Sequence, residues 1–221
     1  MNIYPTILTD QLELVQQQLN LCADSGLVHT IQIDIIDGYF VDNVTVSPGD
    51  LIGMEFGEME LDFHLQTQEP LDFVREIIDY QDDLPVRSII GQVEQMSNQE
   101  LFVDEVRRYG WNAGLSLNLH TPVAEVQSDL WDRINIIQLM AIEAGFQGQE
   151  LEESIYEKLS KLRKRMMDKD LRLEVVVDGG VNVENIAKLQ EHGVSSVGVG
   201  SALWKADDFS EAYQELEAEV L

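Results

Sequence analysis

Three ionisable side chains lie inside apolar stretches of this sequence. Asp34 interrupts HTIQIDII, His64 lies in MELDFHLQ, and Asp178 ends RLEVVVD. A buried carboxylate costs several kcal/mol unless it is paired, hydrogen-bonded or bound to a metal ion. Each of the three alone is compatible with a satisfied core polar group. Three at corresponding positions favour a functional cluster.

The residue types indicate two kinds of chemistry. Two carboxylates on opposite sides of one cavity are suited to removing a proton from one face of a carbon and returning it to the other. An imidazole with two carboxylates can also bind a divalent metal ion. Such an ion would keep both carboxylates ionised and would stabilise an enediolate oxyanion.

The elements that position these residues recur along the chain. A short apolar run is followed, in most cases, by an amphipathic stretch. The eight runs are 3–8, 29–36, 59–66, 86–93, 113–119, 134–142, 172–178 and 195–200. The helical stretches are 10–24, 69–80, 97–109, 152–169, 182–192 and 207–219, whereas 44–58 contains Pro48 and three glycines and is expected to be short or irregular.

Eight strand–helix units in 221 residues predict α/β architecture with a parallel sheet. We expect a single-domain (β/α)8 TIM barrel over residues 1–221. The alternative is an open doubly wound sheet. It is disfavoured because no G-x-G-x-x-G follows the first strand.

In a barrel of this kind the active site lies at the carboxyl ends of the strands. Three glycine-containing turns follow the last three strands, at 145–149, 178–180 and 200–202. Glycine permits close backbone approach and presents N–H donors, so these turns predict a phosphate site. Each turn alone is compatible with an ordinary connection between a strand and a helix.

Composition limits the classes of partner. With 14 basic and 41 acidic residues the net charge is −27, which excludes binding of nucleic acid through phosphate neutralisation. No apolar run is long enough to cross a bilayer, and the N-terminus lacks the pattern of a signal peptide. Cys22 is the only cysteine, so we expect a buried thiol, no internal disulfide and a cytoplasmic location.

These segments together resemble the ribulose-phosphate 3-epimerase family over roughly residues 3–205. The resemblance is carried by PTILTD, IQIDIIDGYFVDN, DFHLQ, GLSLNLHTP, MAIEAGFQGQEL and VVVDGGVNVENIAKLQEHGVSSVGVGSAL. It implies an isomerase of carbohydrate metabolism in the pentose phosphate pathway that binds a divalent metal ion and forms a homo-oligomer. It further implies that Asp34 and Asp178 are the acid/base pair and that both also bind the metal together with His64.

The resemblance and the turns also imply a substrate side of the site. The residues expected to contact the sugar or its phosphate are Thr6, Met140, Gly145, Gln147, Gly148, Gly179, Gly180, Gly200 and Ser201.

The sequence departs from the family pattern within this site. Gln32 stands where the family has a metal-binding histidine and is expected to be the fourth metal ligand, and Ile36 and Gln66 replace two methionines. The loop EAGFQGQ differs from the family's NPGFGGQ at Glu143 and Gln147, among others. Because an amide carbonyl is a harder and weaker ligand than imidazole, we expect Gln32 to disfavour zinc. Mg²⁺, Mn²⁺, Fe²⁺ or no metal then fits better.

Three functions follow from the sequence. The first is epimerisation of D-ribulose 5-phosphate to D-xylulose 5-phosphate at C3, by transfer of protons between two aspartates through an enediolate. The second keeps the site but takes a six-carbon ketose 6-phosphate. The third is a barrel that binds a sugar phosphate without turnover, an alternative prompted by the loss of one metal ligand.

Overall fold

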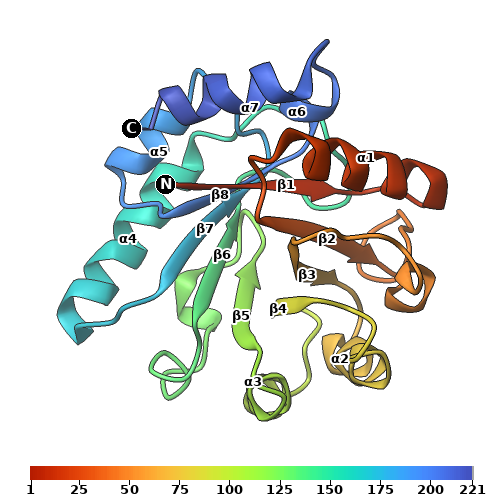
Figure 1. The fold of residues 1–221 in the computed structure, drawn as a ribbon. Coiled ribbons are helices and arrows are strands. Elements are labelled where there is room, and N and C mark those ends of the chain that lie inside the picture. The colour runs from red at the N-terminus through yellow and green to blue at the C-terminus, as the bar shows by residue number, and fades with distance from the viewer. Residues whose placement is uncertain (221) are drawn as a thin grey trace.

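Eight parallel strands close into a barrel in the computed structural model, which describes residues 1–220 (Figure 1). The strands are β1 (Asn2–Ile7), β2 (Thr30–Ile36), β3 (Glu60–Gln66), β4 (Val86–Gln92), β5 (Asn112–Leu117), β6 (Ile136–Met140), β7 (Glu174–Asp178) and β8 (Ser196–Val199). Strand β1 pairs with both β2 and β8, which closes the sheet. The prediction of a (β/α)8 barrel is confirmed, and the open sheet is wrong.

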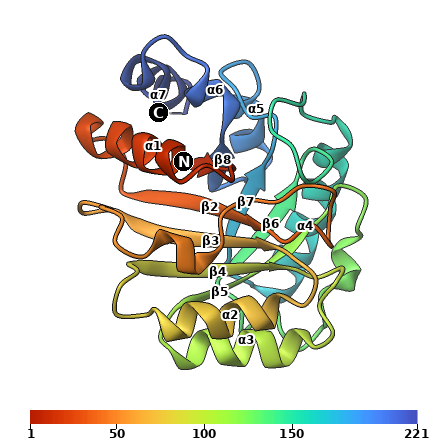
Figure 2. The same cartoon turned by 90° about the vertical axis from the view of Figure 1, so that its right-hand side faces the viewer.

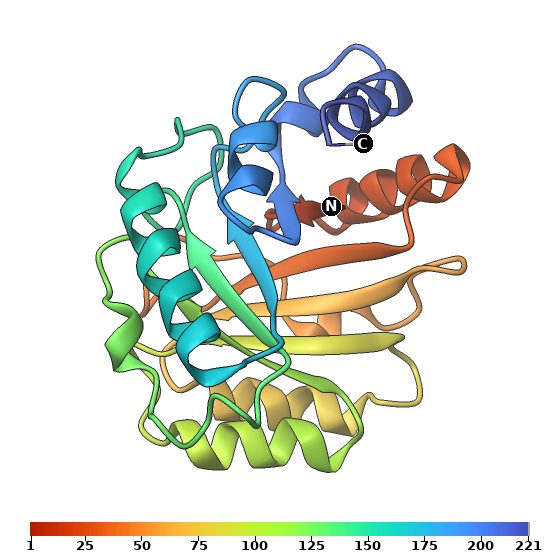
Figure 3. The same ribbon diagram turned by 90° about the vertical axis from the view of Figure 1, so that its left-hand side faces the viewer.

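Helices surround the barrel. They are α1 (Leu12–Ser25), α2 (Pro70–Asp79), α3 (Gln99–Arg108), α4 (Ser154–Lys169), α5 (Ile186–Glu191), α6 (Ser201–Trp204) and α7 (Phe209–Ala218). Figure 2 shows α2 and α3 side by side against the strands, and Figure 3 shows α4 along β6 and β7. No helix within residues 1–220 is long and apolar enough to cross a membrane.

Two connections lack a regular α-helix. The segment after β2 holds only the 3₁₀ turn Pro48–Leu51, as its proline and glycines predict, and the segment after β5 holds the 3₁₀ turn Val123–Glu125. The short helix α6 is a correction to the sequence reading. The residues after β8, which were expected to form only a turn, start this helix at Ser201.

Alternation along the strands separates the outer core from the barrel interior. On β3, Leu61, Phe63 and Leu65 belong to the large apolar core, whereas Asp62, His64 and Gln66 are buried polar residues at the alternate positions. Because successive side chains of a strand point to opposite faces, these three face the barrel interior. The interior is therefore unusually polar for a packed barrel.

A group of polar residues closes the amino-terminal end of the barrel. Arg87 forms an ion pair with Asp62, and its second contact is with Glu174 at 3.4 Å. Tyr4 and Ser196 each donate a hydroxyl hydrogen bond of 2.6 Å to Glu174.

Ile90, Ile136 and Val176 form a separate apolar cluster. Strand register places this cluster between the polar group and the opposite end, where the predicted site lies.

Candidate active site

Asp34 and Asp178 come together at the carboxyl end of the barrel. Asp34 is level with His64 in the pairing of β2 with β3, and Asp178 is level with Met140 in that of β6 with β7. One donor atom from each of Asp34, His64 and Asp178 lies within 4.8 Å of the others, and all three residues are buried. The strand ends thus bring together the three residues that the sequence singled out.

Gln32 lies between the two carboxylates. Its Nε2 atom donates hydrogen bonds to Oδ1 of Asp34 at 2.9 Å and to Oδ2 of Asp178 at 2.7 Å. Gln138 on β6 donates a further bond to Oδ2 of Asp178 at 3.2 Å. Hydrogen bonds to a charged acceptor are about twice as strong as neutral ones, so these amides contribute much of what stabilises the buried pair.

His64 contacts the same carboxylates through one ring nitrogen. Its Nδ1 atom lies 2.9 Å from Oδ1 of Asp34 and 3.6 Å from Oδ2 of Asp178. Its Nε2 atom lies 3.2 Å from the amide of Gln92. With the oxygen of this amide facing the ring, Gln92 accepts from Nε2 and from the hydroxyl of Ser116, and its nitrogen donates to Glu94. That arrangement places the Nε2 hydrogen on the Gln92 side and leaves Nδ1 facing the carboxylates.

Burial raises the pKa of Asp178 from its ordinary value to about 6, and the negative charge of Asp34 acts in the same direction. His64, the amide of Gln32 and the backbone N–H of Gly179 oppose this shift. A carboxyl group with a raised pKa holds a proton closer to neutral pH, which is the property required of a general acid.

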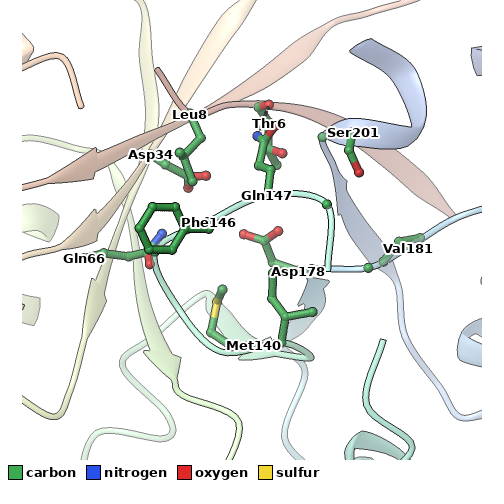
Figure 4. Close-up of a pocket in the computed structure, with 16 residues that line it drawn as sticks. Thr6, Leu8, Asp34, Gln66, Met140, Phe146, Gln147, Asp178, Val181 and Ser201 are labelled. Atoms are coloured by element: carbon green, nitrogen blue, oxygen red, sulfur yellow. Dashed lines mark hydrogen bonds between the residues drawn. The ribbon is translucent and has the colours of Figure 1, made fainter. Parts of the chain in front are cut away.

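A cavity opens above the carboxylates (Figure 4). Every residue that the sequence assigned to the sugar or its phosphate lines it: Thr6, Met140, Gly145, Gln147, Gly148, Gly179, Gly180, Gly200 and Ser201. Asp34, Asp178 and Gln66 also line it, whereas Gln32 and His64 are not among the lining residues.

The glycine turns bring the backbone close to one end of this cavity. Gly180 has φ +70°, and a Cβ there would lie 2.4 Å from the backbone nitrogen of Leu151. Gly179 has φ +105°, and a Cβ there would lie 2.3 Å from Cγ1 of Ile142. Only glycine fits either position, because both the dihedral angle and the space exclude a side chain.

Side chains fill much of the space at this end. Nε2 of Gln147 donates to the carbonyl oxygen of Thr6 at 3.2 Å, and a Cβ on Gly200 would lie 2.6 Å from this Nε2 atom. The cavity is about 30 Å³. Pockets that hold small molecules usually have roughly 300–1,000 Å³, so the cavity is small for a ligand while the side chain of Gln147 is in this position.

Two loops meet at the rim of the cavity. Nδ2 of Asn43, in the loop after β2, donates to the carbonyl oxygen of Gly145, in the loop after β6, at 2.6 Å. A Cβ on Gly145 would lie 3.1 Å from Cγ2 of Val41. Phe146 is 56% exposed although it lines the cavity, as Figure 4 shows. The loop after β6 is therefore attached to the loop after β2.

The barrel geometry is shared with proteins of several functions, but the sequence comparison is decisive. The profile of the Ribulose-phosphate 3 epimerase family matches residues 2–204. The chain belongs to this family. It is 31% identical to the chloroplastic ribulose-5-phosphate-3-epimerase of Arabidopsis thaliana over 98% of this chain and 76% of that protein. It is 29% identical to the ribulose-phosphate 3-epimerase of Bacillus subtilis over 97% of each chain.

A comparison of structures agrees at the level of the fold. A tryptophan synthase α-subunit from Pyrococcus furiosus superposes with a TM-score of 0.69, at 20% identity, over 99% of this chain and 95% of that one. Identity this low indicates the (β/α)8 architecture and nothing about the reaction. The ribulose-phosphate 3-epimerase family itself places the chain among the isomerases, in the class of racemases and epimerases.

The residues present could hold the divalent ion that members of the ribulose-phosphate 3-epimerase family bind. Asp34, His64 and Asp178 offer two carboxylate oxygens and a ring nitrogen around one point. The hydrogen bond from Nε2 of His64 to Gln92 leaves Nδ1 facing that point. Metal-bound histidines are commonly oriented in this way, by a partner that accepts from the ring nitrogen that does not bind the metal. Gln32, in contrast, faces the carboxylates with its NH₂ group rather than its oxygen.

Sequence reasoning missed two positions that shape this epimerase-family site. Gly198 on β8 lies against Asp178, where a Cβ would be 2.8 Å from Oδ1. Gln138 donates to the same carboxylate. Gly198 had a readable signal, since glycine inside a strand often marks a close approach by another group. Gln138, a polar residue within an apolar run, had the same signal as Asp34.

Proposed function

We propose that this protein epimerises a phosphorylated ketose at C3, most simply D-ribulose 5-phosphate to D-xylulose 5-phosphate. The observation that supports this best is the pair of buried carboxylates, Asp34 and Asp178, that meets at one end of a small cavity. A C3 hydrogen next to a ketone is acidic enough for a carboxylate to remove when the resulting enediolate is stabilised.

The chain's own residues supply the steps. One aspartate removes the proton from one face of C3, and the other returns a proton to the opposite face. Asp178 is the better holder of the returning proton, because burial and Asp34 raise its pKa to about 6. The NH₂ group of Gln32 donates to both aspartates and so holds the acid/base pair in place. A bound divalent ion, held by Asp34, His64 and Asp178, would add Lewis-acid stabilisation.

The glycine turns are proposed to hold the phosphate. The cavity end at the turns Gly145–Gly148, Gly179–Gly180 and Gly200–Ser201 is lined by glycine backbone together with the side chains of Phe146, Gln147 and Ser201. In a chain with a net charge of −27, main-chain N–H groups can bind an anion, and one cationic atom is nearby, since a Cβ on Gly148 would lie 3.1 Å from Nζ of Lys205. A phosphate fixed there would orient C3 between the two carboxylates.

A second substrate class is favoured by one specific atom. Oε1 of Gln66 is buried without a hydrogen-bond partner, and Gln66 lines the cavity. An acceptor of this kind is costly to bury unless a ligand satisfies it. A six-carbon ketose 6-phosphate has an additional hydroxyl that could donate to Gln66. A panel of pentulose and hexulose phosphates assayed side by side separates the two substrates.

The test of the proposed reaction uses Asp34→Asn and Asp178→Asn. Each variant should lose interconversion of the two epimers by at least about 100-fold, since each removes one acid/base group. Each variant keeps one aspartate, so any remaining exchange of the C3 hydrogen with D₂O should occur with only one of the two epimers. The epimer that exchanges in Asp34→Asn should be the opposite of the one that exchanges in Asp178→Asn. Asp42→Asn, an exposed acid in the rim loop, is the control. Full interconversion in either site variant would exclude the two-aspartate reaction.

We also propose that the enzyme works in the cytoplasm as a homo-oligomer. The location is supported by Cys22, which is fully buried. Burial raises the pKa of this thiol to about 12, as expected of an inert cysteine. Light scattering with size-exclusion chromatography measures the oligomeric state. A monomer at micromolar concentration would contradict the second part of this proposal.

A further inference from the structure

Each inner oxygen of the carboxylate pair accepts a hydrogen bond from a glutamine amide. Oδ1 of Asp34 accepts from Nε2 of Gln32 and lies 2.9 Å from Nδ1 of His64. Oδ2 of Asp178 accepts from Nε2 of Gln32 and of Gln138. Each inner oxygen therefore has two nitrogen partners. Two buried carboxylates without such partners would be strongly destabilising, or would require a cation.

Gln32 is the residue that joins the two halves of this network. It is 1% exposed, and one nitrogen atom serves both carboxylates. Both hydrogens of its NH₂ group are thus directed at negatively charged acceptors. Within residues 1–220, only Gln32 contacts both aspartates among the four buried glutamines of the strands, which are Gln32, Gln66, Gln92 and Gln138.

A rotation of the terminal amide by half a turn would exchange its nitrogen and oxygen. Oε1 of Gln32 would then lie where Nε2 lies now, about as far from the two carboxylate oxygens. Three oxygens at such distances repel one another unless a cation lies among them. With a cation, the amide oxygen becomes a ligand of the kind that Mg²⁺ and Mn²⁺ accept.

We propose that Gln32 makes the divalent ion optional. Without an ion, its NH₂ group holds Asp34 and Asp178 together, and each carboxylate keeps a hydrogen-bond donor. With an ion, its carbonyl oxygen turns toward the site as a fourth ligand. The part of this inference that concerns turnover rests on the proposed function, whereas the part that concerns stability does not.

Unfolding temperatures test the structural part. Protein stripped with a chelator, and shown to be metal-free by elemental analysis, should remain folded, and Mn²⁺ should raise its unfolding temperature by only a few degrees. Gln32→Met keeps the length of the side chain but removes both donors, and should lower the unfolding temperature of the metal-free protein by roughly 5–10 °C. Gln32→Glu places a third carboxylate in the site and should show a much larger gain with Mn²⁺ than the unchanged protein.

Gln18→Glu is the matched control, because Gln18 is also buried but lies in α1, outside the site. It should destabilise the metal-free and Mn²⁺-treated proteins equally. An equal response to Mn²⁺ in Gln32→Glu and the unchanged protein would overturn the inference. So would a metal-free unchanged protein that is unfolded at room temperature.

Turnover tests the functional part. The metal-free protein should interconvert the epimers within about tenfold of the Mn²⁺-treated protein, since Gln32 keeps the two aspartates that transfer the proton in place without the ion. Loss of activity on stripping that Mn²⁺ restores would overturn this part. If neither form acts on any ketose phosphate, the proposed function fails, and the unfolding temperatures alone decide the role of Gln32.

Discussion

Gly198 leaves the space that the carboxylate of Asp178 occupies. The two residues are level with each other on β8 and β7, and a Cβ on Gly198 would lie 2.8 Å from Oδ1 of Asp178. Real Cβ atoms do not come this close to another heavy atom, so the carboxylate would have to move. The position of a proposed acid/base group thus depends on a residue without a side chain.

Gly198→Ala is therefore expected to lower kcat by about 100-fold, the effect of misplacing a reacting group by about 1 Å. Far-UV circular dichroism should show that the barrel is retained. Gly114→Ala is the control, because a Cβ there is also crowded, 2.8 Å from Cγ1 of Ile90, but does not touch either aspartate. Equal losses of kcat in the two variants would show that crowding in the barrel, rather than displacement of Asp178, is responsible.

Gln147 is expected to compete with the phosphate for one end of the cavity. Gln147→Ala removes the side chain that donates to Thr6, so KM should fall and inorganic phosphate should bind more tightly. Gln147→Glu keeps the size of the side chain and adds a negative charge. It should therefore raise KM and weaken the binding of inorganic phosphate. Calorimetric titration with phosphate measures this without any substrate. Weaker phosphate binding in Gln147→Ala would instead show that the amide is itself a phosphate ligand.

Gln32→His should convert the site to one that prefers zinc. Imidazole is a better zinc ligand than an amide oxygen, so zinc affinity should rise by at least about tenfold. Competition with a chromophoric chelator measures the affinity directly. Gln92→His is a useful contrast, because Gln92 contacts the far nitrogen of His64 rather than the carboxylates. A similar gain in both variants would contradict a specific role for Gln32.

Lys158 on α4 should make stability depend on pH. Its Nζ donates to the carbonyl oxygens of Leu117, Asn118 and Leu119, at the end of β5. Burial lowers the pKa of Lys158 to about 8, and Glu94 partly opposes this shift. Between that pH and about 10.4, the unfolded lysine stays protonated whereas the folded one is neutral, so unfolding takes up a proton.

Stability of the unchanged protein relative to Lys158→Met should therefore rise with pH across this window. The slope has an upper limit of about 1.4 kcal/mol per pH unit. Urea unfolding of both proteins at several values between pH 7 and 10 measures the difference. A difference that is constant with pH, or that falls, would show that Lys158 keeps its charge in the folded state.

Much of this architecture could be predicted from residue pattern. The eight strands lie within about two residues of the apolar runs, and Asp34, His64 and Asp178 meet because equivalent strand ends meet in a closed parallel sheet. Periodicity specifies which face a side chain takes, and that was enough to bring these residues together.

The remaining features depend on packing that periodicity does not encode. The pattern placed Gln32 in the site, but which end of its amide faces the carboxylates is decided by the charges around it. The pattern placed Gln147 in a glycine turn, but it did not predict that the side chain of Gln147 lies in the cavity. Helix α6 escaped prediction because its single turn is too short to show a helical period.

The hydrogen bond from Asn43 to Gly145 has a kinetic consequence. It joins segments that are about a hundred residues apart in the chain but border the same entrance. If the entrance must widen to admit a ketose phosphate and again to let the product leave, breaking this hydrogen bond is part of the energy barrier to both movements, and both segments contribute to it. Substitutions in the stretch after β2, far from the reacting carbon, would then alter the dwell time of bound sugar as strongly as changes beside Phe146.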